Sequence, residues 1–207
     1  RQRQMCIRDS VERMIRGAQA GLDYGARHLG RYPLRELRIA EFPRTVRVTQ
    51  TFPGLTPLSE SAAFIARVDP GSPKDLDYPF YVSARETARQ WWGQQLAASN
   101  QPGGALLADG LAEYTALMTV RRSLGSTAMR RYLRQDLHAY LLGRATATGR
   151  ELPLLRAGAE AWLAQRKGGL ALYLLQDQLG EERVNAVLRD FLRRHGGRDT
   201  APDLSLI

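Results

Sequence analysis

The sequence predicts an α+β fold that is predominantly helical. Helical periodicity covers most of the chain after residue 78, whereas short alternating segments are confined to residues 34–68. Strand-like and helix-like segments do not alternate along the chain, which argues against a parallel sheet built from βαβ units. The 207 residues suffice for one compact domain or for two small lobes that share a cleft, and 43% of them are hydrophobic.

The first part of the chain is expected to contain one helix. Residues 1–9 are polar and join poorly to the segment after them, so we predict a leader outside the fold. Apolar residues recur at helical spacing over residues 10–29, with Ser10 as the N-cap. Gly30 and Pro33 are expected to end this helix.

Three strands are predicted after this helix, over residues 34–42, 45–52 and 62–68. The segment "PGLTPLSES" separates the last two, and its two prolines and glycine predict a loop. Residues 10–78 are therefore expected to form a lobe of one helix and a small sheet.

The remainder of the chain is predicted to be a helical lobe over residues 79–195, followed by a tail over 196–207. The expected helices cover residues 79–98, 104–123, 126–143, 157–178 and 181–194. Glycines mark the breaks, notably Gly125, Gly149 and Gly180.

Composition narrows the classes of function. The net charge is +9, and 28 of the 30 basic residues are arginine. These arginines are scattered, without a basic run longer than two or a nucleic-acid-binding motif, so a solvated basic surface is favoured over nucleic-acid binding. Cys6 is the only cysteine, which excludes an intrachain disulfide, and no apolar run is long enough for a membrane span.

One helical segment carries most of the functional signal. "ARETARQWWGQQL" (84–96) has the rhythm of the zinc-protease motif H-E-x-x-H followed by an aromatic pair. In that motif two histidines one helical turn apart bind one zinc ion, and the glutamate acts as general base toward the zinc-bound water. Arginine stands at both histidine positions here, as Arg85 and Arg89, while Glu86 is retained.

Further blocks occur in a fixed order, namely "LLADGLAEYTALM" (106–118) and "RKGGLALYLLQDQLGEERVNAVLRDFL" (166–192), with "LRELRIAEFPR" and "TQTFPGLTPLSESAAFIARV" upstream. Together they resemble the catalytic domain of the membrane alanyl-aminopeptidase family, the gluzincin zinc aminopeptidases. The resemblance covers about residues 10–195 and is greatest to the bacterial branch joined to ABC-transporter permeases. It implies a thermolysin-like zincin fold.

The resemblance assigns the zinc-ligand positions. The two histidines of the family fall on Arg85 and Arg89, and the third ligand, a glutamate, falls on Asp109. A guanidinium offers only donors and carries no lone pair for a metal, so two of them repel zinc rather than bind it. Asp109 alone does not make a three-ligand catalytic site. The zinc of the family is therefore not expected as a cofactor.

Three further positions come from the resemblance. The general-base glutamate corresponds to Glu86. The transition-state tyrosine falls on Gln165 in "QRKG", and the glutamate that recognises a substrate's amino terminus falls on Glu60 in "PLSES". Losing the tyrosine removes an oxyanion donor. Hydrolysis by conventional zinc chemistry is therefore not expected, and the alternative is an active aminopeptidase with atypical metal ligands.

The altered residues also predict a replacement for the metal. If the fold persists, Arg85 and Arg89 project toward Asp109 with Glu86 beside them and pair with these carboxylates. The alternative is that both arginines bend into an open cleft and stay hydrated. His28, His138 and His195 lie on separate predicted helices away from the ligand positions, and Trp91 and Trp92 are expected in the core.

The chain is thus interpreted as a fragment of a longer protein, degenerate in its catalytic residues. Its partner is expected to be a peptide amino terminus or another protein, and its role to be binding or structural. A membrane association would come through the longer parent protein.

Overall fold

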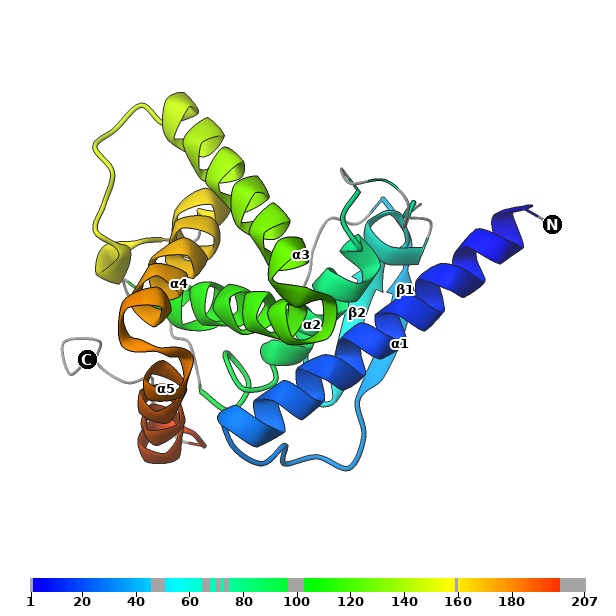
Figure 1. The fold of residues 1–207 in the computed structure, drawn as a ribbon, viewed down its shortest axis with the longest axis horizontal. Helices are drawn as coiled ribbons and strands as arrows, with labels where there is room; N and C mark the ends of the chain where they lie inside the picture. Colours follow the sequence, from blue (N-terminus) through cyan, green and yellow to red (C-terminus); the bar gives the residue numbers. More distant parts are fainter. Residues whose placement is uncertain are drawn as a thin grey trace.

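A computed structural model describes residues 2–45, 51–64, 68–69, 72, 75–96, 103–158 and 160–197. The fold is mainly helical with one small sheet (Figure 1), as the sequence predicts. The α-helices are α1 (Gln2–His28), α2 (Tyr78–Ala88), α3 (Leu111–Thr146), α4 (Gly168–Leu179) and α5 (Glu181–His195). The strands are β1 (Arg38–Phe42) and β2 (Leu55–Ser59). Short elements are the π-helical turns η1 (Glu60–Phe64), η2 (Leu106–Gly110) and η4 (Trp162–Lys167) and the 3-10 turn η3 (Leu154–Arg156).

The strands are parallel, and Ala40 of β1 is opposite Pro57 of β2. The loop predicted for "PGLTPLSES" is therefore wrong, because residues 55–59 form β2. Proline gives no backbone donor and is restricted to sheet edges, which a two-stranded sheet provides. The predicted strand over 62–68 is wrong for residues 62–64, which belong to η1. Residues 46–50 of the predicted strand 45–52 lie outside the described residues.

Helix α1 begins at Gln2, earlier than the predicted N-cap at Ser10, which is buried within the helix. It packs along α2, and glycines permit the close approach. A Cβ on Gly17 would lie 2.2 Å from the carbonyl oxygen of Phe80, and a Cβ on Gly25 would lie 2.5 Å from the ring of Trp91. The two helix backbones therefore lie in direct contact.

Helix α2 is central, and every residue from Pro79 to Ala88 is buried. Asp77 caps its N-terminus by accepting from the amide of Phe80 at 3.2 Å, and it also pairs with Arg13 of α1 at 2.7 Å. Trp91 and Trp92 come after α2 and are fully buried, which confirms the prediction that they belong to the core.

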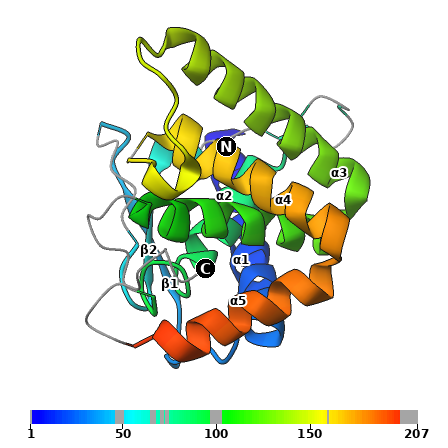
Figure 2. The same cartoon turned by 90° about the vertical axis from the view of Figure 1, so that its left-hand side faces the viewer.

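Helix α3 combines two predicted helices. Gly125 has φ 87° and ψ 166° within it, so the predicted break is a kink. The two halves run in clearly different directions in Figure 1. Gly180, at φ 89°, separates α4 from α5 as predicted. Figures 1 and 2 show α4 and α5 on the opposite side of the molecule from the two strands.

None of the helices in the described part of the chain is both long and apolar enough to cross a membrane.

Candidate functional site

The predicted ligand positions meet where α2 ends against η2. Arg85 is on the last turn of α2, Arg89 caps that helix, and Asp109 is on η2. The side chain of Arg89 donates from Nη2 to Oδ1 of Asp109. The predicted ion pair between an arginine of the motif helix and Asp109 is therefore present.

Glu86 is the central acceptor of this group. Arg85 donates to its Oε1 from Nη2 at 2.6 Å and from Nε at 3.0 Å. Its Oε2 accepts from the hydroxyl of Thr51 at 2.8 Å and lies 3.3 Å from Nε of Arg89. We call Thr51, Arg85, Glu86, Arg89 and Asp109 the outer network.

The charges in the outer network depend on one another. Burial alone would raise the pKa of Glu86, but the charges of Arg85 and Arg89 outweigh it and leave that pKa lowered. Burial likewise opposes the charge of Arg85, yet the Glu86 carboxylate helps to raise the pKa of Arg85 well above its ordinary value. Burial raises the pKa of Asp109, and the attraction of Arg89 offsets this only in part.

Gln165, on η4, is connected to the site through Glu113, a residue that the sequence analysis did not predict. Its Nε2 donates to Oε2 of Glu113 at 2.6 Å. Glu113 is fully buried, its Oε1 accepts from the hydroxyl of Tyr81, and its Oε2 lies 3.9 Å from Nη1 of Arg85. This last contact links the outer network to a second cluster.

The second cluster continues through η4 to the far half of α3. Arg166 donates from Nη1 to the hydroxyl of Tyr81 at 3.2 Å and to Oδ1 of Asp136 at 2.7 Å. The same nitrogen lies 3.6 Å from Oε1 of Glu113. We call Tyr81, Glu113, Asp136, Gln165 and Arg166 the inner network.

Two members of the inner network were within reach of sequence reasoning. Glu113 lies one turn after Asp109 in "ADGLAEY", and Arg166 is next to Gln165 in "QRKG". Asp136 had no such signal, because no predicted site residue lies near it in the sequence.

The glycines of "ADG" and "KGG" allow the backbone segments around the site to approach one another closely. A Cβ on Gly110 would lie 2.8 Å from the carbonyl oxygen of Ala164, and one on Gly168 would lie 3.2 Å from the Cα of Gly110. A Cβ on Gly169 would lie 2.6 Å from Cγ of Glu113. Glycine at these positions lets η2, η4 and the start of α4 come together. Asp109 and Gln165 both lie on the π-helical turns formed there.

Glu60 is the remaining predicted site residue. It begins η1, is half-buried, and belongs to an element that packs against α1 and α2. The structure thus joins Arg85, Glu86, Arg89, Asp109 and Gln165 through the hydrogen bonds and ion pairs above, and it places Glu60 on a neighbouring element.

The residues at the ligand positions do not fit zinc. Both guanidiniums present only donors, and they occupy the carboxylates that a metal would need. Within the part of the chain that the structure describes, no three His, Cys, Asp or Glu side chains are grouped so as to hold a metal ion. What this arrangement can do is fix the end of α2 to η2 through paired charges.

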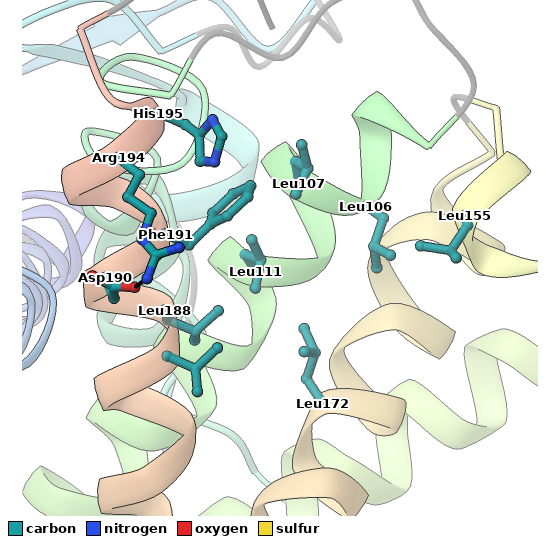
Figure 3. Close-up of a pocket in the computed structure, with 11 residues that line it drawn as sticks. Leu106, Leu107, Leu111, Leu155, Leu172, Leu188, Asp190, Phe191, Arg194 and His195 are labelled. Carbon is teal, nitrogen blue, oxygen red and sulfur yellow. Dashed lines mark ion pairs between the residues drawn. The ribbon is translucent and has the colours of Figure 1, made fainter. Parts of the chain in front are cut away.

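An apolar groove lies beside η2, between it and α5 (Figure 3). Its volume is about 250 Å³. Leucine side chains from η2, α3 and α4 face Phe191 and Leu188 of α5, and Arg194 and His195 stand at the α5 edge. None of the predicted site residues lines this groove.

Solved structures share the fold. An M1 zinc metallopeptidase from Deinococcus radiodurans matches with a TM-score of 0.62 and 20% identity, covering 91% of this chain and 38% of that chain. A mutant of that enzyme bound to a Tyr-Ser-Ala substrate matches with a TM-score of 0.62 and 21% identity, covering 90% and 38%. A mutant two-domain M1 zinc metallopeptidase bound to L-tryptophan matches with a TM-score of 0.60 and 21% identity, covering 87% and 37%.

No protein-family model and no curated protein sequence matches the chain. The structural likeness therefore shows an M1 metallopeptidase-like fold, and at this identity it shows the fold alone. The chain spans under two fifths of the length of the solved chains it matches.

Proposed function

We propose that this chain is an aminopeptidase-like domain that does not hydrolyse peptides. The observation that supports this most directly is the outer network, in which two guanidiniums occupy the positions that zinc-binding histidines hold in the resembled family. Their positive charges pair with Glu86 and Asp109, so no comparable set of lone pairs is left for a metal.

The surroundings of Glu86 also support the loss of hydrolysis. A general base must present a free lone pair to the water that it activates. Three side chains approach the two oxygens of Glu86, those of Arg85, Thr51 and Arg89. The carboxylate is therefore proposed to act as the centre of an ion-pair network rather than as a base.

Gln165 fits the same account. A tyrosine at this position would offer a hydroxyl to a developing oxyanion, as the resemblance implies. The amide of Gln165 instead donates to Glu113 in the interior. Its proposed role is to satisfy a buried carboxylate.

We propose that the role of the domain is binding or structural, as part of a longer protein. Any association with a membrane is proposed to be made by that longer protein. We propose that Glu60 holds the amino terminus of a bound peptide, as the resemblance implies. Calorimetric titration with a short peptide, free or acetylated at its amino terminus, tests this. Binding should require the free amine and should weaken in Glu60→Gln. Equal binding of both peptides would contradict this role for Glu60.

Hydrolysis of alanyl and arginyl amides, with and without a chelator, tests the loss of catalysis. The proposal predicts no turnover that the chelator abolishes. Glu86→Gln is the matched control, because turnover from a contaminating peptidase would persist unchanged in it. Chelator-sensitive turnover that disappears in Glu86→Gln would instead support the alternative, an active aminopeptidase with atypical metal ligands, for which the retained Glu86 is the favouring observation.

A further inference from the structure

Asp136 of the inner network is buried with only half of its carboxyl group paired. Its side chain is 2% exposed, and Oδ1 accepts from Arg166 at 2.7 Å. Oδ2 is also buried, and among the described residues it has no hydrogen-bond partner. An ionised carboxylate with a bare buried oxygen is costly, because neither water nor a donor replaces its lost hydration.

The nearest guanidinium is shared with a second carboxyl group. Nη1 of Arg166 lies 2.7 Å from Asp136 and 3.6 Å from Oε1 of Glu113. Glu113 has further donors, the hydroxyl of Tyr81 and the amide of Gln165. Glu113 therefore has two side-chain hydrogen-bond donors besides the guanidinium that it shares with Asp136.

The titratable groups around Asp136 come from three elements. Tyr81 belongs to α2, Glu113 to the first half of α3, and Arg166 to η4. On α3 itself, the two tyrosines one turn from Asp136 donate hydrogen bonds to other groups. Tyr132 donates to the carbonyl of Asp77 at 2.9 Å, and Tyr140 donates to Glu151 at 2.8 Å. Among these groups Arg166 is the one cation.

Charge counting over both networks agrees with one protonated carboxyl group. The described residues of the two networks include three guanidiniums, on Arg85, Arg89 and Arg166. They include four carboxyl groups, on Glu86, Asp109, Glu113 and Asp136. One proton on a carboxyl group makes the buried assembly neutral.

We propose that Asp136 holds a proton at neutral pH in the folded chain and directs its Oδ2 hydroxyl toward Glu113. The unpaired oxygen then becomes a donor, and the carboxyl–carboxylate pair joins the two halves of α3 beneath η4. Loss of this proton places a fourth negative charge in the interior. The contact that holds the far half of α3 should therefore weaken as the pH rises. The inference does not depend on whether the chain hydrolyses peptides.

The electrostatics agree with this assignment. Burial raises the pKa of Asp136 to about 8, and the charge of Glu113 acts in the same direction against Arg166. An acid whose pKa is raised on folding contributes its full stability below its unfolded pKa, roughly 3.9. That stability is lost as the pH rises toward the folded value. The wild-type chain should therefore lose stability between about pH 4 and pH 8 through Asp136.

Asp136→Asn tests the proposal through the sign of its effect. Asparagine keeps the acceptor for Arg166 and a donor at the second position without any charge. The variant should equal the wild type in melting temperature at about pH 4 and exceed it by an amount that grows up to about pH 8. A variant that melts below the wild type at every pH would overturn the proposal, because it would show a charged Asp136 paired with Arg166. Asp190→Asn is the control, since Asp190 also pairs with arginine but is solvent-accessible, and it should show no such gain.

Infrared spectroscopy of the wild type in D2O gives a second, direct readout that does not need the variant to fold. A carbonyl stretch of a protonated carboxyl group should be present at neutral pH and fade through mildly alkaline pH. Its absence at neutral pH would overturn the proposal. Where Asp136→Asn folds, the band should be missing from it, and a band that survives the substitution would place the proton elsewhere and also overturn the assignment.

Discussion

Arg85 and Glu86 are consecutive residues of α2, yet their side chains form a buried ion pair with Nη2 2.6 Å from Oε1. Adjacent residues of a helix do not normally face each other. The pair forms because α2 is buried on all sides, so that each charge must find a partner within reach. The remaining oxygen of Glu86 then lies close to Arg89. Two arginines and one glutamate thus form a compact charged unit at the end of a buried helix.

The ion pair between Arg89 and Asp109 should stabilise the fold measurably. Both side chains are mostly shielded, with 21% and 24% of their surfaces exposed. We expect Arg89→Ala and Asp109→Ala each to lower the free energy of unfolding, with a coupling energy of about 1–2 kcal/mol in the double-mutant cycle. Urea denaturation of the four proteins measures this. Strictly additive effects would mean that the two side chains do not interact in solution.

Glu86 should make the protein sensitive to acid. Because its pKa is lowered on folding, its stabilising contribution is present above the unfolded pKa, roughly 4.3, and is lost as the pH falls through the lower folded value. Glu86→Gln should cost about 3–5 kcal/mol at neutral pH, because it leaves Arg85 without its main partner. The variant should also lose less of its unfolding free energy than the wild type as the pH falls below the unfolded pKa of glutamate.

Glu182→Gln is the matched control for that experiment, since Glu182 is exposed on α5. It should leave the acid limb of the stability curve unchanged. If Glu86→Gln and Glu182→Gln gave the same pH profile, the charge coupling around Glu86 would be refuted.

Gly17 should be required for the contact between α1 and α2. Alanine favours a helix over glycine by about 1 kcal/mol, so helix propensity predicts that Gly17→Ala stabilises the protein. Packing predicts the opposite sign, because the new Cβ would lie 2.2 Å from the backbone oxygen of Phe80. We expect a net loss of roughly 1–3 kcal/mol in thermal or urea unfolding.

Gly149→Ala serves as the control for Gly17→Ala, because a Cβ at Gly149 meets no atom within 4 Å. Its effect should stay within about 0.5 kcal/mol. A stabilising Gly17→Ala would show that the two helices are farther apart than described.

Local patterns predicted the helix breaks at Gly125 and Gly180 correctly, but the helix predicted over 79–98 is too long, because α2 ends at Ala88. Gly125 and Gly180 have positive φ values that other residues rarely adopt, so the breaks they mark are real. Pro57 misled the strand prediction, because proline in an edge strand has the same composition signal as proline in a loop. The earlier start of α1 was missed because Ser10 is a good N-cap residue that is here buried inside a helix.

The charged residues of the outer network were predictable, since the motif spacing places its arginines on one turn of α2 and the block order supplies Asp109, whereas Thr51 was not predicted. Of the inner network only Gln165 was predicted, and nothing in the sequence pointed to Tyr81 or Asp136. Tyr81, Asp136 and Arg166 come from three separate elements, and the kink at Gly125 sets the direction of the half of α3 that carries Asp136. The π-helical turns at Asp109 and Gln165 likewise depend on close contacts between glycines far apart in sequence.

The most direct test of the central claim is the zinc content of the purified chain after loading with zinc and desalting, measured by mass spectrometry. The variant Arg85→His/Arg89→His/Asp109→Glu, which restores the ligand types of the resembled family, is measured beside it. We predict almost no zinc in the wild type and about one zinc ion per chain in the triple variant. Stoichiometric zinc in the wild type would contradict the claim that the two arginines have replaced the metal.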